Sequence, residues 1–414
     1  MTIGKSRIFL IWAPLCLFFV YQFILRVSPN VMTQEILVHF QINATNFGIL
    51  TSLYYLGYAV MQIPIGILLD KYGPKQISAF CALLCVIGAL LFSSSDFWGL
   101  ALFARFLIGV GSSGAFISAT KVIRSWAPEK YFSIFVSITI TIGLLSAHQA
   151  GNLTSYFMTL FGWKKTVLYL GLGGLLLTGF ILLCVKNNPK KEKEEIGDKI
   201  FSKVFLSKLF AHLIDKKIIW IGFWGAFLTG PLYVLGDVWG VSYMMNVFNW
   251  NKHQATEAST IIYFGMACGG PLVAAFSEKF NRHRKNIIAF LAFGMGLILA
   301  FEMLVKPPYE VVLFLNFIVG AFCSYQILVF SLVVLNTPPR LSGVTFGVVN
   351  TINMLSGFVY LPLVGYVLDK YWKGAMEGGI PIYSAETYQM AISVIVVGLF
   401  IGGTGFLFTR LKKT

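Results

Sequence analysis

The stretch Gly66-Ile67-Leu68-Leu69-Asp70-Lys71-Tyr72-Gly73-Pro74-Lys75 lies between two long apolar segments, 47–69 and 76–94. It contains two glycines, one carboxylate and two lysines within ten residues. Glycine permits close backbone approach and tight turns. Asp70 is placed to meet a neighbouring helix end or a basic side chain. The stretch therefore predicts that one apolar helix ends here and that a charged hairpin turns the chain back into the next.

The composition of the whole chain is that of a membrane protein. Hydrophobic residues make up 57% of the chain, charged residues only 12%, and the mean hydropathy is +0.76. Apolar runs long enough to span about 30 Å of hydrocarbon recur along the sequence. The six cysteines lie in apolar segments without close pairs, and the five histidines are scattered. We therefore expect no metal, no cofactor and no enzymatic constellation.

Apolar runs bounded by charges or turn residues predict twelve transmembrane helices. A polar stretch, residues 186–217, separates the sixth run from the seventh, so we expect an N-terminal bundle at 1–185, a cytoplasmic linker at 186–217 and a C-terminal bundle at 218–414. Residues 201–213 of the linker have helical apolar spacing, which is compatible with an interfacial helix or a disordered linker. The predicted helices are 8–31, 47–69, 76–94, 98–120, 131–158, 166–185, 218–246, 256–277, 286–305, 310–335, 344–368 and 387–409.

The distribution of basic residues predicts the orientation. With the N-terminus inside, the inner segments carry 24 of the 32 lysines and arginines, and the outer segments carry 6. This bias places both termini in the cytoplasm. The net charge of +15 therefore reflects membrane topology rather than nucleic-acid binding. The apolar run after Lys5 and Arg7 is too long for a signal peptide, so we expect a retained first helix.

The two halves show a weak internal repeat. An offset of 211 residues places Arg26 on Asp237, Gly109 on Gly320 and Pro128 on Pro339. A shorter offset of 208 places Asp70 on Glu278, within a weaker copy of the hairpin. Two pseudo-symmetric six-helix bundles are what parallel repeats in transporters produce.

The hairpin resembles a signature of the major facilitator superfamily, in which Gly66, Asp70, Gly73 and the basic Lys75 match the pattern. The run from Arg105 through Gly109 and Gly111 resembles a second signature. The resemblance implies an all-α membrane protein whose bundles give alternating access to a central site. It assigns gating to the hairpin residues and to Glu278. Arg105 is a candidate for proton coupling, or alternatively holds helices together through backbone carbonyls.

Arg26 is the leading substrate-binding candidate. It forms a polar stripe with Gln22 and Asn30 at four-residue spacing. A guanidinium can hold a carboxylate or phosphate bidentately, although Arg26 is also near enough to the outer interface to snorkel. The run 23–29 also resembles a bacterial subgroup that includes phagosomal nutrient transporters, many of which take up amino acids.

Asp237 lies at the position in helix 7 that corresponds to Arg26, with Tyr233 four residues before it. A carboxylate here is a candidate proton acceptor, a partner for a substrate amine, or a counter-ion for Arg26. An arginine and an aspartate on opposed cavity helices would suit a zwitterion. If Asp237 only neutralises Arg26, an organic anion or sugar phosphate is favoured.

Other polar or aromatic residues within the apolar segments are further substrate-binding candidates. For each of them, packing is the competing explanation. They are His148 and Asn152 in helix 5, Tyr325 and Gln326 in helix 10, Asn350 and Asn353 in helix 11, and the tyrosines Tyr54, Tyr55, Tyr58 and Tyr263.

These patterns predict a monomeric secondary active transporter of a bacterial inner membrane. We expect proton-coupled uptake of a small carboxylate-bearing nutrient such as an amino acid or short peptide. The alternatives are export of a siderophore or drug, and a membrane sensor that does not transport. Drug exporters of the superfamily often have a Gly-Pro signature in helix 5, and this chain has no proline there.

Overall fold

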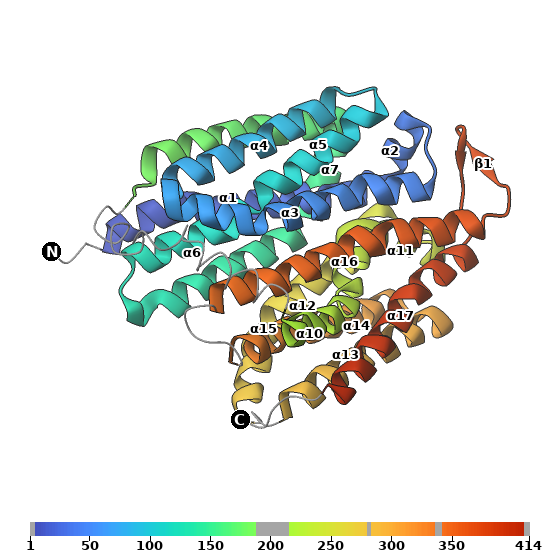
Figure 1. Ribbon diagram of the computed structural model, residues 1–414. Coiled ribbons are helices and arrows are strands. Elements are labelled where there is room, and N and C mark those ends of the chain that lie inside the picture. Colours follow the sequence, from blue (N-terminus) through green and yellow to red (C-terminus); the bar gives the residue numbers. More distant parts are fainter. Residues whose placement is uncertain (1–4, 188–214, 280–282, 336–341, 410–414) are drawn as a thin grey trace. The chain divides into compact units, whose positions relative to one another are not determined.

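The structure is a computed structural model that describes residues 5–187, 215–279, 283–335 and 342–409 (Figure 1). Within these ranges, ten helices are long and apolar enough to cross a membrane, or eleven if a pair bent by 48° counts as one span. Helices are expected because a chain in lipid must satisfy its backbone hydrogen bonds internally. The mostly helical membrane fold confirms the predicted fold class.

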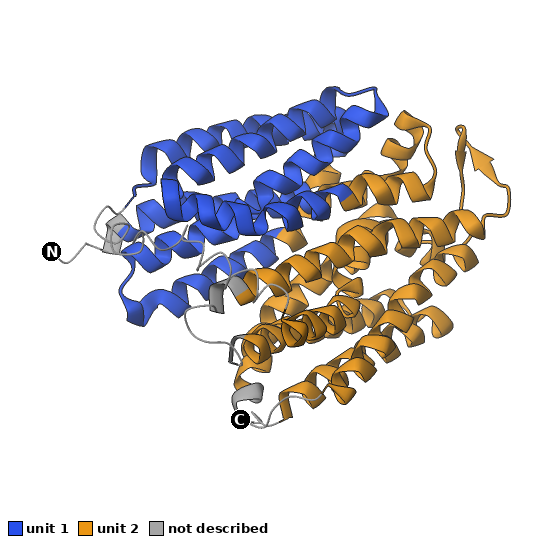
Figure 2. Cartoon of the chain, viewed as in Figure 1, with its two compact units in different colours: residues 1–26, 53–146, 157–212 blue, residues 27–52, 147–156, 213–414 orange. Residues whose placement is uncertain are grey.

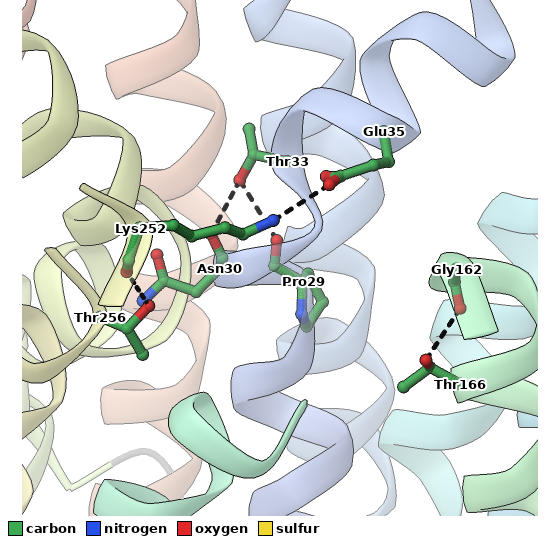
Figure 3. A network of polar contacts seen from close by, with 8 residues as sticks. All are labelled: Pro29, Asn30, Thr33, Glu35, Gly162, Thr166, Lys252 and Thr256. Atoms are coloured by element: carbon green, nitrogen blue, oxygen red, sulfur yellow. Dashed lines mark hydrogen bonds and ion pairs between the residues drawn. The ribbon is translucent and has the colours of Figure 1, made fainter. Parts of the chain in front are cut away.

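The first six predicted helices all have counterparts. One helix, α7, covers both the fifth and the sixth, but Gly162 inside it has a left-handed φ of 75°. The helix resumes there with Thr166 Oγ1 donating to the Gly162 carbonyl at 2.8 Å (Figure 3). The helices are α1 Lys5–Val31, α2 Thr33–Phe40, α3 Ala44–Tyr72, α4 Pro74–Ser94, α5 Trp98–Ser112, α6 Gly114–Trp126 and α7 Glu129–Cys184.

The last six predicted helices also have counterparts, and the seventh is divided into three parts. Its middle part is a π-helix, η1, which contains Asp237. The elements are α10 Lys216–Phe227, η1 Pro231–Trp239, α11 Gly240–Phe248, α12 Lys252–Lys279, α13 Arg284–Val305, α14 Tyr309–Cys323, α15 Tyr325–Leu335, α16 Ser342–Lys370, the strands β1 Met376–Glu377 and β2 Ile380–Pro381, and α17 Ala385–Phe408. The two strands pair antiparallel.

The chain divides into two compact units (Figure 2). Unit 1 contains residues 1–26, 53–146 and 157–212, and unit 2 contains residues 27–52, 147–156 and 213–414. In unit 1, α4 packs against α5; in unit 2, α12 packs against α14 and α13 against α17. Two segments of the first half in sequence, 27–52 and 147–156, therefore belong to unit 2. The bundle boundaries 1–185 and 218–414 stay a prediction, and the predicted interfacial helix 201–213 lies outside the described residues.

Both units contain a helix crossing of the same design. In unit 1, a Cβ at Gly109 would overlap the Tyr54 carbonyl oxygen, and one at Gly57 would overlap that of Phe106. In unit 2, Gly320 meets Ile262 and Gly265 meets Phe317 in the same way. The residues of the second crossing follow those of the first at offsets of 208 on one helix and 211 on the other. Small residues let helix backbones touch in this way, and the recurrence supports the predicted pseudo-symmetry.

Three elements have no counterpart among the predicted ones. They are the eight-residue helix α2, the π-helix η1 and the β1–β2 hairpin. The π-helix η1 contains both Tyr233 and Asp237, and residues four apart in a π-helix still lie nearly on one side of it. Their assignment to one binding site stays a prediction.

Candidate functional site

Arg26 is buried near the end of α1 in unit 1, at 5% exposure. Its Cζ lies 5.3 Å from the ring centroid of Tyr55 and 5.5 Å from that of Phe23. One turn earlier on α1, Gln22 accepts a hydrogen bond of 2.7 Å from the Tyr54 hydroxyl. Aromatic faces stabilise a guanidinium without neutralising its charge. Burial also disfavours the snorkelling alternative, because a snorkelling side chain would be exposed.

Arg105 on α5 is a second buried guanidinium in unit 1. Its Nη1 donates to the carbonyl oxygen of Leu25 on α1 at 3.0 Å, and its Cζ lies 5.5 Å from the Tyr54 ring centroid. A contact of this kind is expected if Arg105 holds helices together through backbone carbonyls, which is the alternative to a role in proton coupling. Arg105 thus joins α1 and α5 beside Arg26, while its role in coupling stays a prediction.

Asp237 is fully buried in η1 of unit 2, where it accepts a hydrogen bond from the Tyr263 hydroxyl of α12. Tyr233, the other candidate on η1, donates instead to the Met354 sulfur at 3.9 Å. One turn before Tyr263, Ser259 donates to the Leu235 carbonyl oxygen at 2.6 Å. Two side chains of α12 therefore hold η1, and one of them holds the carboxylate.

The repeat relates the surroundings of Asp237 to those of Arg26. Asp237 follows Arg26 at the offset of 211, and Tyr263 follows Tyr55 at the offset of 208. The Arg26–Tyr55 pair and the Asp237–Tyr263 pair thus occupy equivalent positions in the two repeats, with opposite charge. Tyr55 and Tyr263 are equivalent only at the offset of 208 residues, the offset that also places Asp70 on Glu278.

Asn30, the third residue of the predicted polar stripe, belongs to unit 2. Its Nδ2 donates to the Gly236 carbonyl oxygen and to Ser259 Oγ, both at 3.0 Å, and its Oδ1 accepts from the Val241 backbone N–H at 3.0 Å. Figure 3 shows Asn30, whose carbonyl oxygen accepts from Thr33 Oγ1 at 3.1 Å. Asn30 therefore satisfies backbone groups around η1, and its predicted role in substrate binding is untested.

The candidates on α7, α15 and α16 lie in unit 2, in varied surroundings, whereas Tyr58 is buried on α3 in unit 1, with its ring centroid 6.3 Å from that of Tyr54. His148 Nδ1 lies 3.2 Å from Thr260 Oγ1, and the Tyr325 hydroxyl donates to the Gly225 carbonyl oxygen at 3.3 Å. Both contacts join neighbouring helices, and the roles of His148 and Tyr325 in substrate binding stay predictions. Among these candidates, three buried amide atoms have no hydrogen-bond partner within the described part of the chain, while Asn350 is half-buried. The three atoms are Asn152 Oδ1, Gln326 Nε2 and Asn353 Oδ1.

The signature hairpin forms as predicted, at the junction of α3 and α4. Asp70 accepts a hydrogen bond of 3.0 Å from Lys121 Nζ on α6, and the side chains are 42% and 13% exposed, respectively. Gly73 has a φ of 82° and precedes α4, which begins with Pro74. Gly66 has no described atom within 4 Å of a Cβ built on it, so its expected role in close backbone approach is not seen.

Asn187, which the sequence did not single out, organises this hairpin. Its Oδ1 accepts from the Lys75 backbone N–H at 3.0 Å, and its Nδ2 donates to Gln76 Oε1 at 2.7 Å. An asparagine far along the chain carries no local signal for such a contact. Glu278, the gating candidate in the second half, lies in α12, and its side chain is outside the described part of the chain.

Comparison with known proteins identifies transporters. The chain is 26% identical to "Uncharacterized transporter YybO" of Bacillus subtilis (strain 168), over 65% of this chain and 66% of that protein. It is 22% identical to "Probable sulfoacetate transporter SauU" of Cupriavidus necator, over 86% of each. It is 21% identical to a "Hexuronate transporter" of B. subtilis, over 83% of this chain and 85% of that one.

The fold has a close counterpart among solved structures. A bacterial homolog of the human lysosomal transporter Spinster, in an inward-facing and unoccupied conformation, matches 98% of this chain and 97% of its own with a TM-score of 0.76 and 19% identity. The family model for the Major Facilitator Superfamily matches residues 14–362. This range includes the hairpin, Arg105, the Arg26–Tyr55 pair and the Asp237–Tyr263 pair. The chain therefore belongs to the Major Facilitator Superfamily.

Proposed function

We propose that this transporter takes up a small organic anion by alternating access, driven by protons, and that Arg26 holds the anionic group. The observation that carries the proposal is the buried Arg26 guanidinium between the rings of Phe23 and Tyr55. A guanidinium in low dielectric binds carboxylate or sulfonate with paired, charge-assisted hydrogen bonds.

The charges of unit 1 favour an anionic substrate. Its described acidic residues are Asp70, Asp96 and Glu129, and they lie at or near helix ends. By contrast, Arg26 is buried on α1 and Arg105 is buried on α5. The interior of this unit therefore carries positive charge. Relatives named for sulfoacetate and hexuronate transport support the same substrate class, whereas no relative described above is named for amino acids.

The proton site is proposed at Asp237. It is a carboxyl group inside a membrane protein, and such groups commonly mark proton pathways. The Tyr263 hydroxyl donates a hydrogen bond to the carboxyl group and thereby fixes its position. The distribution of lysine and arginine supports a protein of a bacterial inner membrane with both termini in the cytoplasm.

A proteoliposome uptake screen tests the proposal. The purified chain is reconstituted, and uptake of sulfonates, sugar acids, dicarboxylates, amino acids and dipeptides is measured with and without an inward proton gradient. We expect saturable uptake of an organic acid, with accumulation only when the gradient is present. Gradient-independent uptake would contradict proton coupling, and absence of saturable uptake for every compound would contradict the substrate class.

Two variants of Arg26 separate its charge from its geometry. Arg26→Lys keeps the charge but loses the planar, two-pronged donor, so KM should rise about tenfold. Arg26→Gln loses both, and we expect uptake of the anion to fall at least a hundredfold. Equal transport by Arg26→Gln and the parent chain would remove Arg26 from the binding site.

A further inference from the structure

Asp369 lies near the end of α16, where it accepts hydrogen bonds from the beginning of α3. Its Oδ1 accepts from the Ala44 backbone N–H at 3.2 Å, and its Oδ2 accepts from the Thr45 backbone N–H at 2.8 Å. The Thr45 hydroxyl also donates to Oδ2. All of these residues belong to unit 2. A carboxylate contributed by one helix thus caps the N-terminus of another that lies 324 residues earlier in the chain.

The cap completes the hydrogen bonding of the first turn of α3. The first N–H groups of any helix lack partners within the helix. Asn43, just before α3, accepts from the Asn46 N–H with its side chain at 3.0 Å and from the Phe47 N–H with its carbonyl at 3.1 Å. The Thr45 N–H donates to Asp369, and the Ala44 N–H is shared between Asp369 and the Tyr383 hydroxyl. The carboxylate also matches the positive end of the helix dipole.

Tyr383, in the loop before α17, reinforces the cap. Its hydroxyl donates to Asp369 Oδ1 and accepts from the Ala44 N–H at 3.0 Å. Burial, together with the hydrogen bond to Asp369, raises the pKa of Tyr383 above its ordinary value. A tyrosine hydroxyl is protonated at physiological pH even at its ordinary pKa of about 10, so Tyr383 remains a donor there.

The two helices touch beside this cap through one glycine from each helix. A Cβ at Gly48 on α3 would overlap the Leu361 carbonyl oxygen of α16, and one at Gly365 on α16 would overlap the Ala44 carbonyl oxygen. Gly365 lies one turn before Asp369. The backbone contact therefore places Asp369 at the first turn of α3, with no intervening side chain.

Other contacts of the same segment are weaker or uncharged. Asn30 bonds to η1, and Lys252 Nζ donates to Glu35 Oε1 at 3.0 Å (Figure 3). The side chains of Lys252 and Glu35 are 33% and 36% exposed, so solvent screens that ion pair. Asp369 is a half-buried carboxylate that accepts from Ala44, Thr45 and Tyr383, so it joins the beginning of α3 to the end of α16 through several hydrogen bonds.

We propose that Asp369 is a latch residue for transport. In the state seen here it holds residues 27–52 on the second-half helices, and transport requires this cap to break and re-form. The inference rests on the proposed alternating access but on no particular substrate. When the cap breaks, the Ala44 and Thr45 N–H groups must be hydrated, and Phe47 must leave Trp239, whose ring lies 5.2 Å from its own.

The test measures opening directly by labelling a cysteine. In a chain whose six native cysteines are replaced, Phe47→Cys is introduced at the buried contact with Trp239. Labelling with a membrane-impermeant maleimide is then compared with and without Asp369→Asn, which keeps the shape of the side chain but removes its charge. We expect labelling to become about tenfold faster. Tyr383→Phe, which removes one hydroxyl, should accelerate it less.

A matched control lies close to the cap. Glu386 forms an ion pair with Lys373, and their side chains are 68% and 64% exposed. Glu386→Gln should leave the labelling rate unchanged, because an exposed pair contributes little. The latch would be overturned if the Asp369→Asn and Tyr383→Phe proteins were labelled no faster than the Glu386→Gln protein.

A cross-link tests whether transport requires the cap between Asp369 and the beginning of α3 to break. Thr45→Cys and Asp369→Cys, joined by a short bifunctional thiol reagent with a cleavable disulfide, should abolish uptake, and reductant should restore it. Uptake that persists after complete cross-linking would overturn the proposal. Because the labelling test needs no substrate, a failed substrate assignment and a failed latch give different results.

Discussion

Tyr263 and Tyr55 occupy equivalent positions in the two repeats, and a matched pair of substitutions distinguishes their roles. Tyr263→Phe removes the donor to the buried Asp237 carboxyl. A hydrogen bond to a charged group contributes about 1.5–3 kcal/mol, so we expect uptake to fall at least tenfold. Tyr55→Phe keeps the ring that faces Arg26, and uptake should change less than threefold. Proteoliposome uptake at equal protein density measures both.

The residue scale also shows where prediction from sequence succeeds. Arg26, Asp237, Arg105 and Tyr263 could be named because a polar or charged group is rare in an apolar helix. Asp369 and Asn187 could not, since they lie near the ends of predicted helices, where polar residues are ordinary. The partners that matter most are far away in the chain: Thr45 lies 324 residues from Asp369, and Gln76 lies 111 residues from Asn187. No local pattern encodes such contacts.

The helix crossing repeated in both units predicts equivalent responses to equivalent substitutions. Gly109→Ala and Gly320→Ala each place a Cβ on a backbone carbonyl oxygen of the facing helix. Overpacking of this kind costs about 1–3 kcal/mol or more, so both variants should melt at lower temperature in detergent. Gly179→Ala is the control, because no described atom lies within 4 Å of its Cβ. A melting temperature for either crossing variant equal to that of Gly179→Ala would contradict the close packing.

The hairpin predicts a coupled pair of substitutions. Gly73→Ala puts alanine at a φ of 82° and its Cβ against the Asn187 side chain. The backbone strain alone costs on the order of 1–3 kcal/mol. In an Asn187→Ala background the overlap disappears while the strain stays, so Gly73→Ala should lower the melting temperature by a smaller amount there. Gly66→Ala, in the same hairpin, should have little effect. Additive effects of the Gly73 and Asn187 substitutions would contradict their contact.

At the scale of elements, the long helices were predictable and their interruptions were not. An apolar run long enough to span lipid has few alternatives to a helix. The π-helix η1 departs from this pattern because its backbone groups have partners outside the segment. The Asn30 side chain bonds to the Gly236 carbonyl and the Val241 N–H. Since Asn30 lies more than 200 residues away in the chain, the pattern of residues 218–246 alone indicates a single helix.

At the scale of the molecule, sequence order and spatial grouping differ. The predicted linker 186–217 would divide the sequence into two halves, whereas residues 27–52 and 147–156 are grouped by contact with the second half. A sequence boundary records the repeat from which the fold is built. The contact grouping instead records the state in which those segments are docked, through groups such as Asn30, Asp369 and His148. The grouping should therefore change during transport.

Coupling is the property of the whole molecule that the proposed function predicts. If Asp237 carries the coupling proton, Asp237→Asn should abolish accumulation driven by a proton gradient, because the amide cannot exchange a proton. Exchange of labelled for unlabelled substrate across the same membrane should continue, since it needs only binding and alternating access. Arg26→Gln should instead lose both activities, because it removes the anion site. The distinguishing measurement is the ratio of exchange to gradient-driven uptake in proteoliposomes. Equal loss of both activities in well-folded Asp237→Asn protein would assign the carboxyl group to substrate binding or packing rather than to coupling.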